Sequence, residues 1–324
     1  MKGVILDADS LGKGEVDLSP VTDLLDEWQV YGTSSRTETT TRIREATVVL
    51  SNKIVLDEEK LSIAGKLRLI SVMATGTNNI DLDAAKSAGI TVSNAVAYAT
   101  PSVVQHTIGL MLALSTNLCA YIHDVKSGAW QNAPAFCLLN HPISELQGKS
   151  LGIVGFGELG SNVAVVARAF GMKILISQRP GNKNPSRGYL PFDDLISEVD
   201  YLSLHCPLTA ETENLINLAA LEKMKPSAFL INTARGGLVN AADLLQALES
   251  NLIKGAAVDV LNTEPPLAED LLTNANQNNL IVTPHNAWGA IESRQRLVQQ
   301  MADNIRGFLA GKPIRVVTRL TGLH

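Results

Sequence analysis

Residues 150–160 read Ser150-Leu151-Gly152-Ile153-Val154-Gly155-Phe156-Gly157-Glu158-Leu159-Gly160. A short apolar run therefore leads directly into G-x-G-x-x-G, and residues 161–170 have the apolar spacing of a helix. Gly171 ends that helix, and residues 173–177 have the composition of a second buried strand. The complete strand, glycine turn, helix and strand predict a dinucleotide site, whereas a glycine triplet alone would also fit a structural turn.

The glycines of this loop have different predicted tasks. Gly155 permits a tight turn, Gly157 lets the backbone approach a pyrophosphate, and Gly160 lets the helix pack closely on the strand. The N–H groups at the start of the helix are then available to the anion. We expect the whole loop to contact the dinucleotide, namely Gly155, Phe156, Gly157, Glu158, Leu159 and Gly160.

The end of the second strand bears on the choice between NAD and NADP. NAD sites usually have an acidic residue there, which accepts hydrogen bonds from the ribose hydroxyls. This chain has Ser177-Gln178-Arg179 instead, with Lys183 and Arg187 close behind. Such residues favour a 2′-phosphate, but they also fit a solvated basic loop, and Gln178 can still bond to a ribose hydroxyl. The predicted cofactor is NAD(P), with NADP(H) slightly favoured and NAD(H) not excluded.

Length and composition set the class of protein. A chain of 324 residues exceeds one comfortable core, so we expect two domains. A net charge of −5 and 4% aromatic residues argue against a nucleic-acid partner. No apolar run approaches the about 18 residues of a membrane span, and the apolar run in residues 1–7 is too short for the signal peptide of a secreted protein. The three cysteines (Cys119, Cys137 and Cys206) have no metal-ligand spacing, which indicates reduced thiols in the cytoplasm and no metal site.

Alternating strands and helices predict an α/β chain with two doubly wound parallel-sheet domains. The first is flavodoxin-like, with strands at 4–6, 47–50, 68–73 and 91–93 and helices at 21–28, 58–64 and 81–87. A long helix at 99–118 precedes the Rossmann sheet, which has further strands at 201–204, 228–231, 255–258 and 280–282, and a terminal helix spans 294–308. We expect residues 1–98 and 292–324 to form the substrate domain, into which the dinucleotide-binding Rossmann domain, 99–291, is inserted.

Residues 119–147 form an otherwise loop-like segment with apolar side chains at Trp130, Phe136, Leu138 and Leu139. Exposed apolar side chains of this kind need cover. We expect an arm that is buried in a second subunit, and hence a homodimer.

Reactive side chains stand just beyond the ends of predicted strands, where open α/β sheets bind ligands: Arg235, Glu264 and His285. Reduction of a keto acid needs a cation for its carboxylate and carbonyl and a group that protonates the new alkoxide. Arginine and histidine meet those needs, and a glutamate bonded to the histidine would fix its tautomer. Taken singly, each also fits an ordinary role, as a surface ion pair, a solvated charge and a buried imidazole.

The turn at 74–79 also follows a strand, and its backbone N–H groups can hold a carboxylate. A loop that only connects strand and helix would have the same composition.

Several of these segments together resemble the D-isomer-specific 2-hydroxyacid dehydrogenases over nearly the whole chain: Ala234-Arg235-Gly236-Gly237, Val258-Asp259-Val260 with Glu264-Pro265, Pro284-His285, and the stretches 74–76, 102–107 and 205–209. The resemblance implies that Arg235 binds the 2-oxo acid, His285 is the acid/base and Glu264 orients it. It also implies that Thr75 and Gly76 hold the substrate carboxylate. Further implied dinucleotide contacts are His205, Cys206, Pro207, Thr212, Thr233, Ala234 and Asp259, the last near the nicotinamide amide.

Pro284-His285-Asn286-Ala287-Trp288, residues 235–239 and Gln105-His106-Thr107 are most similar to the glycerate dehydrogenase and hydroxypyruvate reductase branch. This implies hydroxypyruvate and D-glycerate, or glyoxylate and glycolate, as substrates, with Tyr98 and Trp288 over the pocket. Two alternatives share the fold: the C-terminal binding protein co-repressors, which sense the dinucleotide, and formate or phosphonate dehydrogenases.

Overall fold

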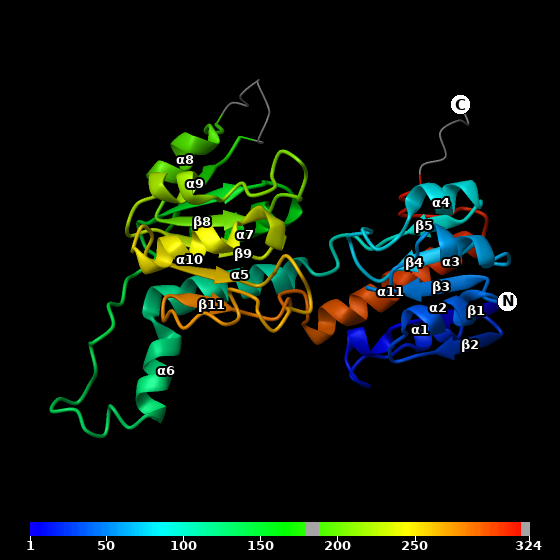
Figure 1. Cartoon of the computed structure of the whole chain (residues 1–324), viewed down its shortest axis with the longest axis horizontal. Helices are drawn as coiled ribbons and strands as arrows, with labels where there is room; N and C mark the ends of the chain where they lie inside the picture. Colours follow the sequence, from blue (N-terminus) through cyan, green and yellow to red (C-terminus); the bar gives the residue numbers. More distant parts are fainter. Residues whose placement is uncertain (179–187, 319–324) are drawn as a thin grey trace. The chain divides into compact units, whose positions relative to one another are not determined.

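The computed structural model describes residues 1–178 and 188–318, and the chain divides into two compact units (Figure 1). Unit 1 comprises Met1–Ala99 and Gly289–His324, and unit 2 comprises Thr100–Trp288. Each unit contains one parallel sheet covered by helices, so the predicted α/β fold with two doubly wound sheets is confirmed. The chain passes from unit 1 to unit 2 after Ala99 and returns to unit 1 after Trp288.

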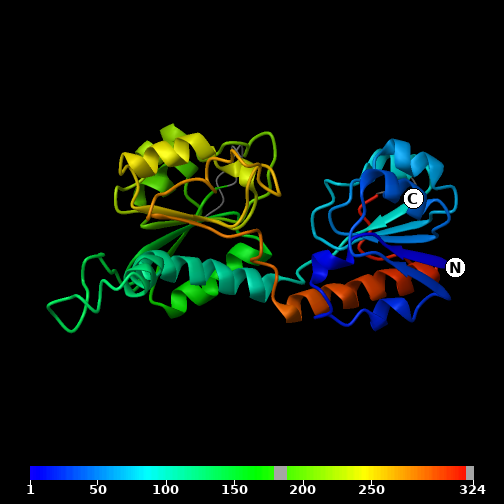
Figure 2. The same cartoon turned by 60° about the horizontal axis from the view of Figure 1, so that its bottom comes forward.

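The sheet of unit 1 has the strand order β2-β1-β3-β4-β5, which is the flavodoxin-like order. Its strands are β1 (Lys2–Ile5), β2 (Glu27–Val30), β3 (Val48–Ser51), β4 (Leu69–Val72) and β5 (Thr91–Ser93). Its helices are α1 (Ser19–Thr22), α2 (Arg36–Ile43), α3 (Glu58–Ile63), α4 (Leu82–Ser87) and α11 (Ile291–Leu309), with a short 3-10 helix, η1, at Ala8–Leu11. Every residue of β3 and β4 is buried, because helices cover both faces of the sheet (Figure 2).

One helix prediction in unit 1 is wrong. Residues 21–28 were expected to be helical, but α1 ends at Thr22 and Glu27–Val30 form β2. The reason is tertiary: Trp28 lies directly opposite Gly3 in the β1–β2 pair, and a Cβ atom on Gly3 would lie 2.5 Å from its ring. Pairing with β1 thus overrides the helical spacing of the apolar residues in this segment.

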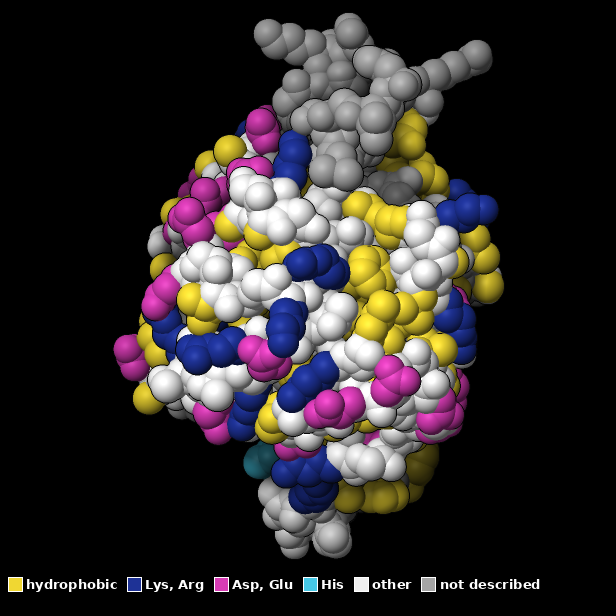
Figure 3. Space-filling model, turned by 90° about the vertical axis from the view of Figure 1, so that its right-hand side faces the viewer, with side chains coloured by type: hydrophobic (Ala, Val, Ile, Leu, Met, Phe, Trp, Pro, Cys, Tyr) yellow, Lys and Arg dark blue, Asp and Glu magenta, His cyan; other side chains and the backbone are white. Residues whose placement is uncertain are grey.

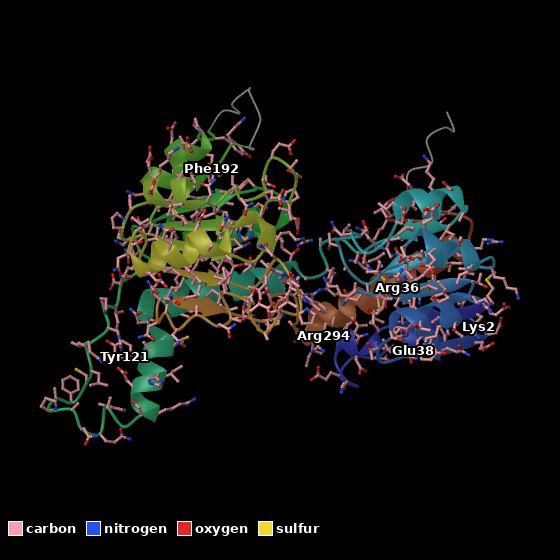
Figure 4. All side chains as sticks on the ribbon, in the orientation of Figure 1. Lys2, Arg36, Glu38, Tyr121, Phe192 and Arg294 are labelled. Carbon is pink, nitrogen blue, oxygen red and sulfur yellow. The ribbon has the colours of Figure 1, made fainter. Side chains whose placement is uncertain are left out.

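Helix α2 was not predicted, although the sequence carries its signal. Ser35 and Glu38 form a capping box, in which Glu38 N–H donates to Ser35 Oγ and Ser35 N–H donates to Glu38 Oε2. Arg36 and Glu38 project from the first turn of this helix (Figure 4).

The sheet of unit 2 is entirely parallel, with the order β11-β10-β9-β8-β6-β7. Its strands are β6 (Ser150–Val154), β7 (Lys173–Ile176), β8 (Tyr201–Leu204), β9 (Phe229–Asn232), β10 (Gly255–Val258) and β11 (Leu280–Val282). An isolated parallel bridge joins Ser177 to Leu190 at the β7 edge. The order reverses between β6 and β8, so the expected switch point lies at the glycine loop that follows β6.

Helices cover both faces of this sheet. On one face lie α5 (Thr100–Thr116) and α7 (Glu158–Ala169), with a core that includes Met111, Val163 and Ile231. On the other lie α8 (Phe192–Glu198), α9 (Leu218–Lys223) and α10 (Ala241–Glu249), with a core that includes Leu195, Leu221 and Leu244. A 3-10 turn, η2 (Gly236–Leu238), follows β9.

The segment 119–147 was expected to be loop-like, but its first part is helical. Helix α5 ends at Thr116, Asn117 adopts a left-handed conformation with φ 52°, and a second helix, α6, spans Leu118–Lys126. In the described part of the chain, no single helix has the length and apolar character to cross a membrane; only α5 and α6 taken together do, and they bend by 62°.

Charged side chains of both signs are interspersed on the face of unit 1 that Figure 3 shows. Many are paired, as in the exposed contact of Arg36 with Glu59 at 3.0 Å. Such exposed pairs contribute little stability each.

Candidate active site

Three neighbouring strands deliver the predicted reactive residues to one edge of the unit 2 sheet. Strand β10 pairs in parallel with both β9 and β11, so their carboxyl ends lie side by side. Arg235 follows β9, Glu264 follows β10 and His285 follows β11. Asn232 at the end of β9 lies in register with Val258 of β10, which in turn lies in register with Val282 of β11.

The structure brings Glu264 and His285 into direct contact. His285 Nδ1 lies 2.5 Å from Glu264 Oε2, and the other carboxylate oxygen accepts a hydrogen bond from Leu261 N–H at 2.9 Å. With both its oxygens engaged, the carboxylate fixes the tilt and tautomer of the imidazole ring. Nε2 is then the ring nitrogen that can exchange a proton with a substrate.

The backbone of His285 is held in an unusual conformation. Its φ is 50°, in the left-handed region that a residue with a Cβ atom rarely adopts. Its N–H donates to Thr283 O at 3.0 Å, and its carbonyl accepts from Trp288 Nε1 at 2.9 Å. Because such a conformation costs on the order of 1 kcal/mol, the surrounding contacts must stabilise it.

Asp259 supplies contacts on both sides of this histidine. Its carboxylate is 1% exposed and accepts from Thr283 Oγ1 at 2.6 Å, Asn286 N–H at 3.0 Å and Ala287 N–H at 2.9 Å. The resemblance implied that Asp259 stands near a nicotinamide amide. In the structure, its carboxylate bonds to the loop that carries His285.

Arg235 joins the other two residues through its loop. Asn232 closes that loop, because its amide donates to Arg235 O at 2.8 Å and accepts from Ala234 N–H at 3.0 Å. A Cβ atom on Gly236 would lie 2.1 Å from the carbonyl carbon of Leu261, so the chain packs directly on the segment that leads to Glu264. The Arg235 side chain is exposed and donates to Ala234 O at 2.6 Å.

This arrangement combines an oriented imidazole with an exposed guanidinium. The imidazole can give a proton to an alkoxide or take one from an alcohol, and the guanidinium can bind a carboxylate and polarise a carbonyl. The sequence reasoning missed two groups that build the site, Asn232 and Thr283, because the only signal for either is its place at a strand end.

The glycine loop has the geometry that a pyrophosphate requires. Gly155 has φ 96°, and a Cβ atom there would lie 2.5 Å from Cys206 N. A Cβ atom on Gly160 would lie 2.1 Å from Gly155 O, whereas one on Gly157 would meet nothing within 4 Å. The first and third glycines therefore permit close packing within the protein. Gly157, at the N-cap of α7, borders open space in which an anion can reach the helix N-terminus.

Strand β7 is followed by two uncharged side chains, Ser177 and Gln178. Ser177 and Gln178 are both buried; Ser177 Oγ donates to Gln178 O at 2.8 Å, and Gln178 N–H donates to Leu190 O at 2.6 Å. Arg179, Lys183 and Arg187, on which the prediction for NADP(H) also relied, lie outside the described residues.

The segment after β8 forms a turn that its own side chains close. Thr212 Oγ1 donates to Pro207 O at 2.8 Å and accepts from Thr209 N–H at 2.8 Å. His205 Nε2 contacts Ser203 Oγ at 2.9 Å, while its Nδ1 is buried without a hydrogen-bond partner among the described residues. Burial lowers the pKa of His205 to about 4, so this histidine is neutral at neutral pH.

The other predicted cofactor residues of this edge are largely buried. Burial raises the pKa of the Cys206 thiol, which therefore stays protonated and is a poor nucleophile. Thr233 Oγ1 lies 3.1 Å from Thr107 Oγ1 of α5, and Ala234 is buried beside it.

The predicted substrate-binding residues lie in both units. Thr75 and Gly76 belong to the loop after β4 in unit 1, where Thr75 O accepts from Asn94 Nδ2 at 2.7 Å. Trp288 belongs to unit 2 and is half-buried. Across residues 1–178 and 188–318, no group of three or more His, Cys, Asp or Glu side chains is arranged to hold a metal ion.

Comparison with known proteins gives a consistent family relationship. Residues 108–287 match the family model described as D-isomer specific 2-hydroxyacid dehydrogenase, NAD binding domain. The chain is 43% identical over 276 residues to a glycerate dehydrogenase from Methylorubrum extorquens, an alignment that covers 85% of this chain and 87% of the relative. It is 36% identical over 325 residues to a hydroxypyruvate reductase from Blautia hydrogenotrophica, covering 98% and 100% of the two chains.

The fold agrees with a solved structure as well. A D-lactate dehydrogenase from Aquifex aeolicus, determined with NAD and lactic acid, superposes with a TM-score of 0.82 at 28% identity, covering 99% of this chain and 100% of that one.

Proposed function

The chain belongs to the D-isomer-specific 2-hydroxyacid dehydrogenases, and from this we propose the substrate that it takes and the residues that carry its reaction. It is an oxidoreductase that acts on a CH–OH group with a nicotinamide dinucleotide as cofactor. The proposed reaction is the interconversion of hydroxypyruvate and D-glycerate, or of glyoxylate and glycolate. Relatives named for the first pair, similar over most of their length, support the choice.

His285 is the proposed acid and base, and its contact with Glu264 is the observation that carries the proposal. The 2.5 Å contact to Nδ1 orients the ring, so that Nε2 can protonate the substrate oxygen during reduction. The bound dinucleotide supplies or accepts the hydride. In the reverse direction, the neutral ring takes the hydroxyl proton.

Arg235, Thr75 and Gly76 are the proposed ligands of the substrate. The guanidinium of Arg235 has the charge and fork geometry to bind the carboxylate and polarise the carbonyl of a 2-oxo acid. Thr75 and Gly76 offer backbone N–H groups to a carboxylate, and Trp288 is a further proposed substrate contact. In this assignment, unit 1 is the substrate domain and unit 2 the dinucleotide-binding domain.

The dinucleotide is held in this proposal by the glycine loop, with the pyrophosphate at Gly157, where a Cβ atom would meet nothing within 4 Å. The remaining contacts come from the strand ends around the loop: Ser177, Gln178, Arg179, His205, Cys206, Pro207, Thr212, Thr233, Ala234, Arg235, Asp259 and His285. The cytoplasm is the proposed location, because Cys119, Cys137 and Cys206 are free thiols, which a reducing compartment preserves.

We also propose a homodimer formed through residues 119–147. None of the nine residues of α6, all of them described, is buried, although Leu118, Ile122 and Val125 have the spacing of one helix face. Phe136 in the following arm is 90% exposed, and Trp130 and Leu139 are exposed too. The arm is nevertheless tied to α6, because Tyr121 (Figure 4) donates to His141 O at 2.6 Å and His141 Nε2 lies 2.9 Å from Asp124 Oδ2.

A pocket of about 380 Å³ lies beside this apolar surface. It is lined by Leu114, Asn117, Cys119 and Pro142 and by residues at the amino ends of β9, β10 and β11, the opposite end of the strands from the reactive residues. A second copy of the chain carries the same apolar surface, so the two surfaces can cover each other.

Removing the reactive side chains tests the assignment of roles. We expect His285→Ala and Arg235→Ala each to lower kcat/KM with hydroxypyruvate by about 10²–10⁴-fold, because a positioned acid or cation is lost. Dinucleotide affinity should change far less, and Glu264→Gln should be milder. Steady-state kinetics and a fluorescence titration measure both quantities. Arg306→Ala, at an exposed arginine, serves as the control. Wild-type turnover in His285→Ala or in Arg235→Ala would contradict the assignment.

The cofactor preference depends on the end of β7. We expect NADPH to be used at least as well as NADH, because no carboxylate repels a 2′-phosphate at Gln178. A charge-assisted hydrogen bond from Arg179 would contribute about 1.5–3 kcal/mol, or about one to two decades of preference. The measurement is kcat/KM with both cofactors.

Two variants sharpen this comparison. Arg179→Ala should lose activity with NADPH alone, while Arg168→Ala, in the last turn of α7, should leave the ratio unchanged. A preference for NADH of more than about tenfold in the wild type would show that this account of the pocket is wrong.

The oligomeric state follows from the apolar face of α6. We expect the wild type to be a dimer by light scattering at micromolar concentration, and Ile122→Glu with Val125→Glu to be monomeric, because burying two carboxylates without partners is costly. The matched control is Val55→Glu, an exposed valine of unit 1, which should remain dimeric. A monomeric wild type would rule out this interface.

A further inference from the structure

His106 of α5 reaches the carboxyl edge of the unit 2 sheet, although no role in the reaction described above falls to it. Its Nε2 lies 3.1 Å from Thr283 Oγ1 and 3.5 Å from Asp259 Oδ1. The side chain is 23% exposed, whereas the Asp259 side chain is 1% exposed. Both partners stand next to the loop that carries His285.

Counting protons identifies the donor in this cluster. The Thr283 hydroxyl has one hydrogen, and it is donated to Asp259 Oδ1 at 2.6 Å, because a carboxylate oxygen can only accept. Thr283 Oγ1 can therefore only accept from His106. It follows that His106 carries a proton on Nε2 and donates it to Thr283.

The chain of hydrogen bonds continues to the backbone around His285. Asp259 accepts from Thr283 on one side of His285 and from the N–H groups of Asn286 and Ala287 on the other. Between these contacts His285 has φ 50°, which persists only if its neighbours are held in place. His106 thus stands at the outer end of a network whose inner end fixes the reactive imidazole.

We propose that His106 is a positioning residue: its Nε2–H orients the Thr283 hydroxyl toward Asp259, and Asp259 in turn holds the backbone that aims His285 at the substrate. This inference rests on the proposed function, in which His285 is the acid and base. In the sequence, His106 is only part of a stretch that resembles the family. Its role follows from the two distances to Thr283 and Asp259.

The test compares two replacements that fill similar space. His106→Gln keeps an N–H donor that can reach Thr283, whereas His106→Leu removes it. We expect His106→Leu to lower kcat about tenfold and His106→Gln to recover it to within about threefold, as for one hydrogen bond of ordinary strength. The KM for the dinucleotide should stay within about twofold, because His106 is not among the proposed dinucleotide contacts. Gln105→Leu, at the neighbouring exposed position of α5, is the matched control.

A second readout needs no turnover. Hydrogen exchange of the Asn286 and Ala287 amides, followed by mass spectrometry of the full chain, reports directly on the bonds to Asp259. We expect faster exchange in this segment for His106→Leu and nearly wild-type exchange for His106→Gln. If His106→Leu does not fold, His106→Ala removes the donor instead and should show the same faster exchange and lower kcat.

Three results would overturn the proposal. The first is unchanged amide exchange and kcat in His106→Leu, and the second is an equal fall in kcat in His106→Gln and His106→Leu. The third is a change in His106→Leu that affects the KM of the dinucleotide and leaves kcat unchanged. Absence of turnover in the wild type with every 2-oxo acid would instead contradict the proposed function. The exchange comparison would still decide the role of His106.

Discussion

Parallel pairing of β9, β10 and β11 places the carboxyl ends of three strands side by side, and the candidate site depends on this constraint. Each strand is short; β9 and β10 are buried and β11 is partly buried, so the strand ends are fixed by backbone hydrogen bonds and core packing. The residues that follow the strands need only short loops to meet at one edge. Catalytic side chains can therefore come from separate loops and still be held precisely enough to react.

At that edge, the side chains proposed to react are held in place by other polar side chains that do not react. Asn232 closes the loop of Arg235, and Asp259 holds the loop of His285. A hydrogen bond of this kind contributes about 1 kcal/mol, so the three that Asp259 accepts together exceed the cost, on the order of 1 kcal/mol, of the left-handed backbone at His285. The strain is confined to His285, and the buried carboxylate of Asp259 stabilises this backbone conformation.

Much of this could be predicted from the sequence because the signals are local. The glycine loop is a contiguous motif, and Arg235, Glu264 and His285 all follow recognisable strand ends. The failures have tertiary causes. Trp28 sits in a helical spacing but packs on Gly3, and the described residues of unit 2 leave every residue of α6 unburied. Thr283 and His106 are far apart in sequence, and the motif that contains His106 does not point to Thr283, so only the fold shows that they meet.

The most direct test of the account is to follow the hydride itself. The enzyme would be incubated with hydroxypyruvate and reduced dinucleotide that carries deuterium at both hydrogen positions of the nicotinamide C4, and the product would be analysed for label and configuration. If the edge of β9, β10 and β11 catalyses the proposed reduction, the product is D-glycerate with deuterium on C2, and the His285→Ala enzyme forms it far more slowly. A product without deuterium on C2, or with the L configuration, would contradict the account.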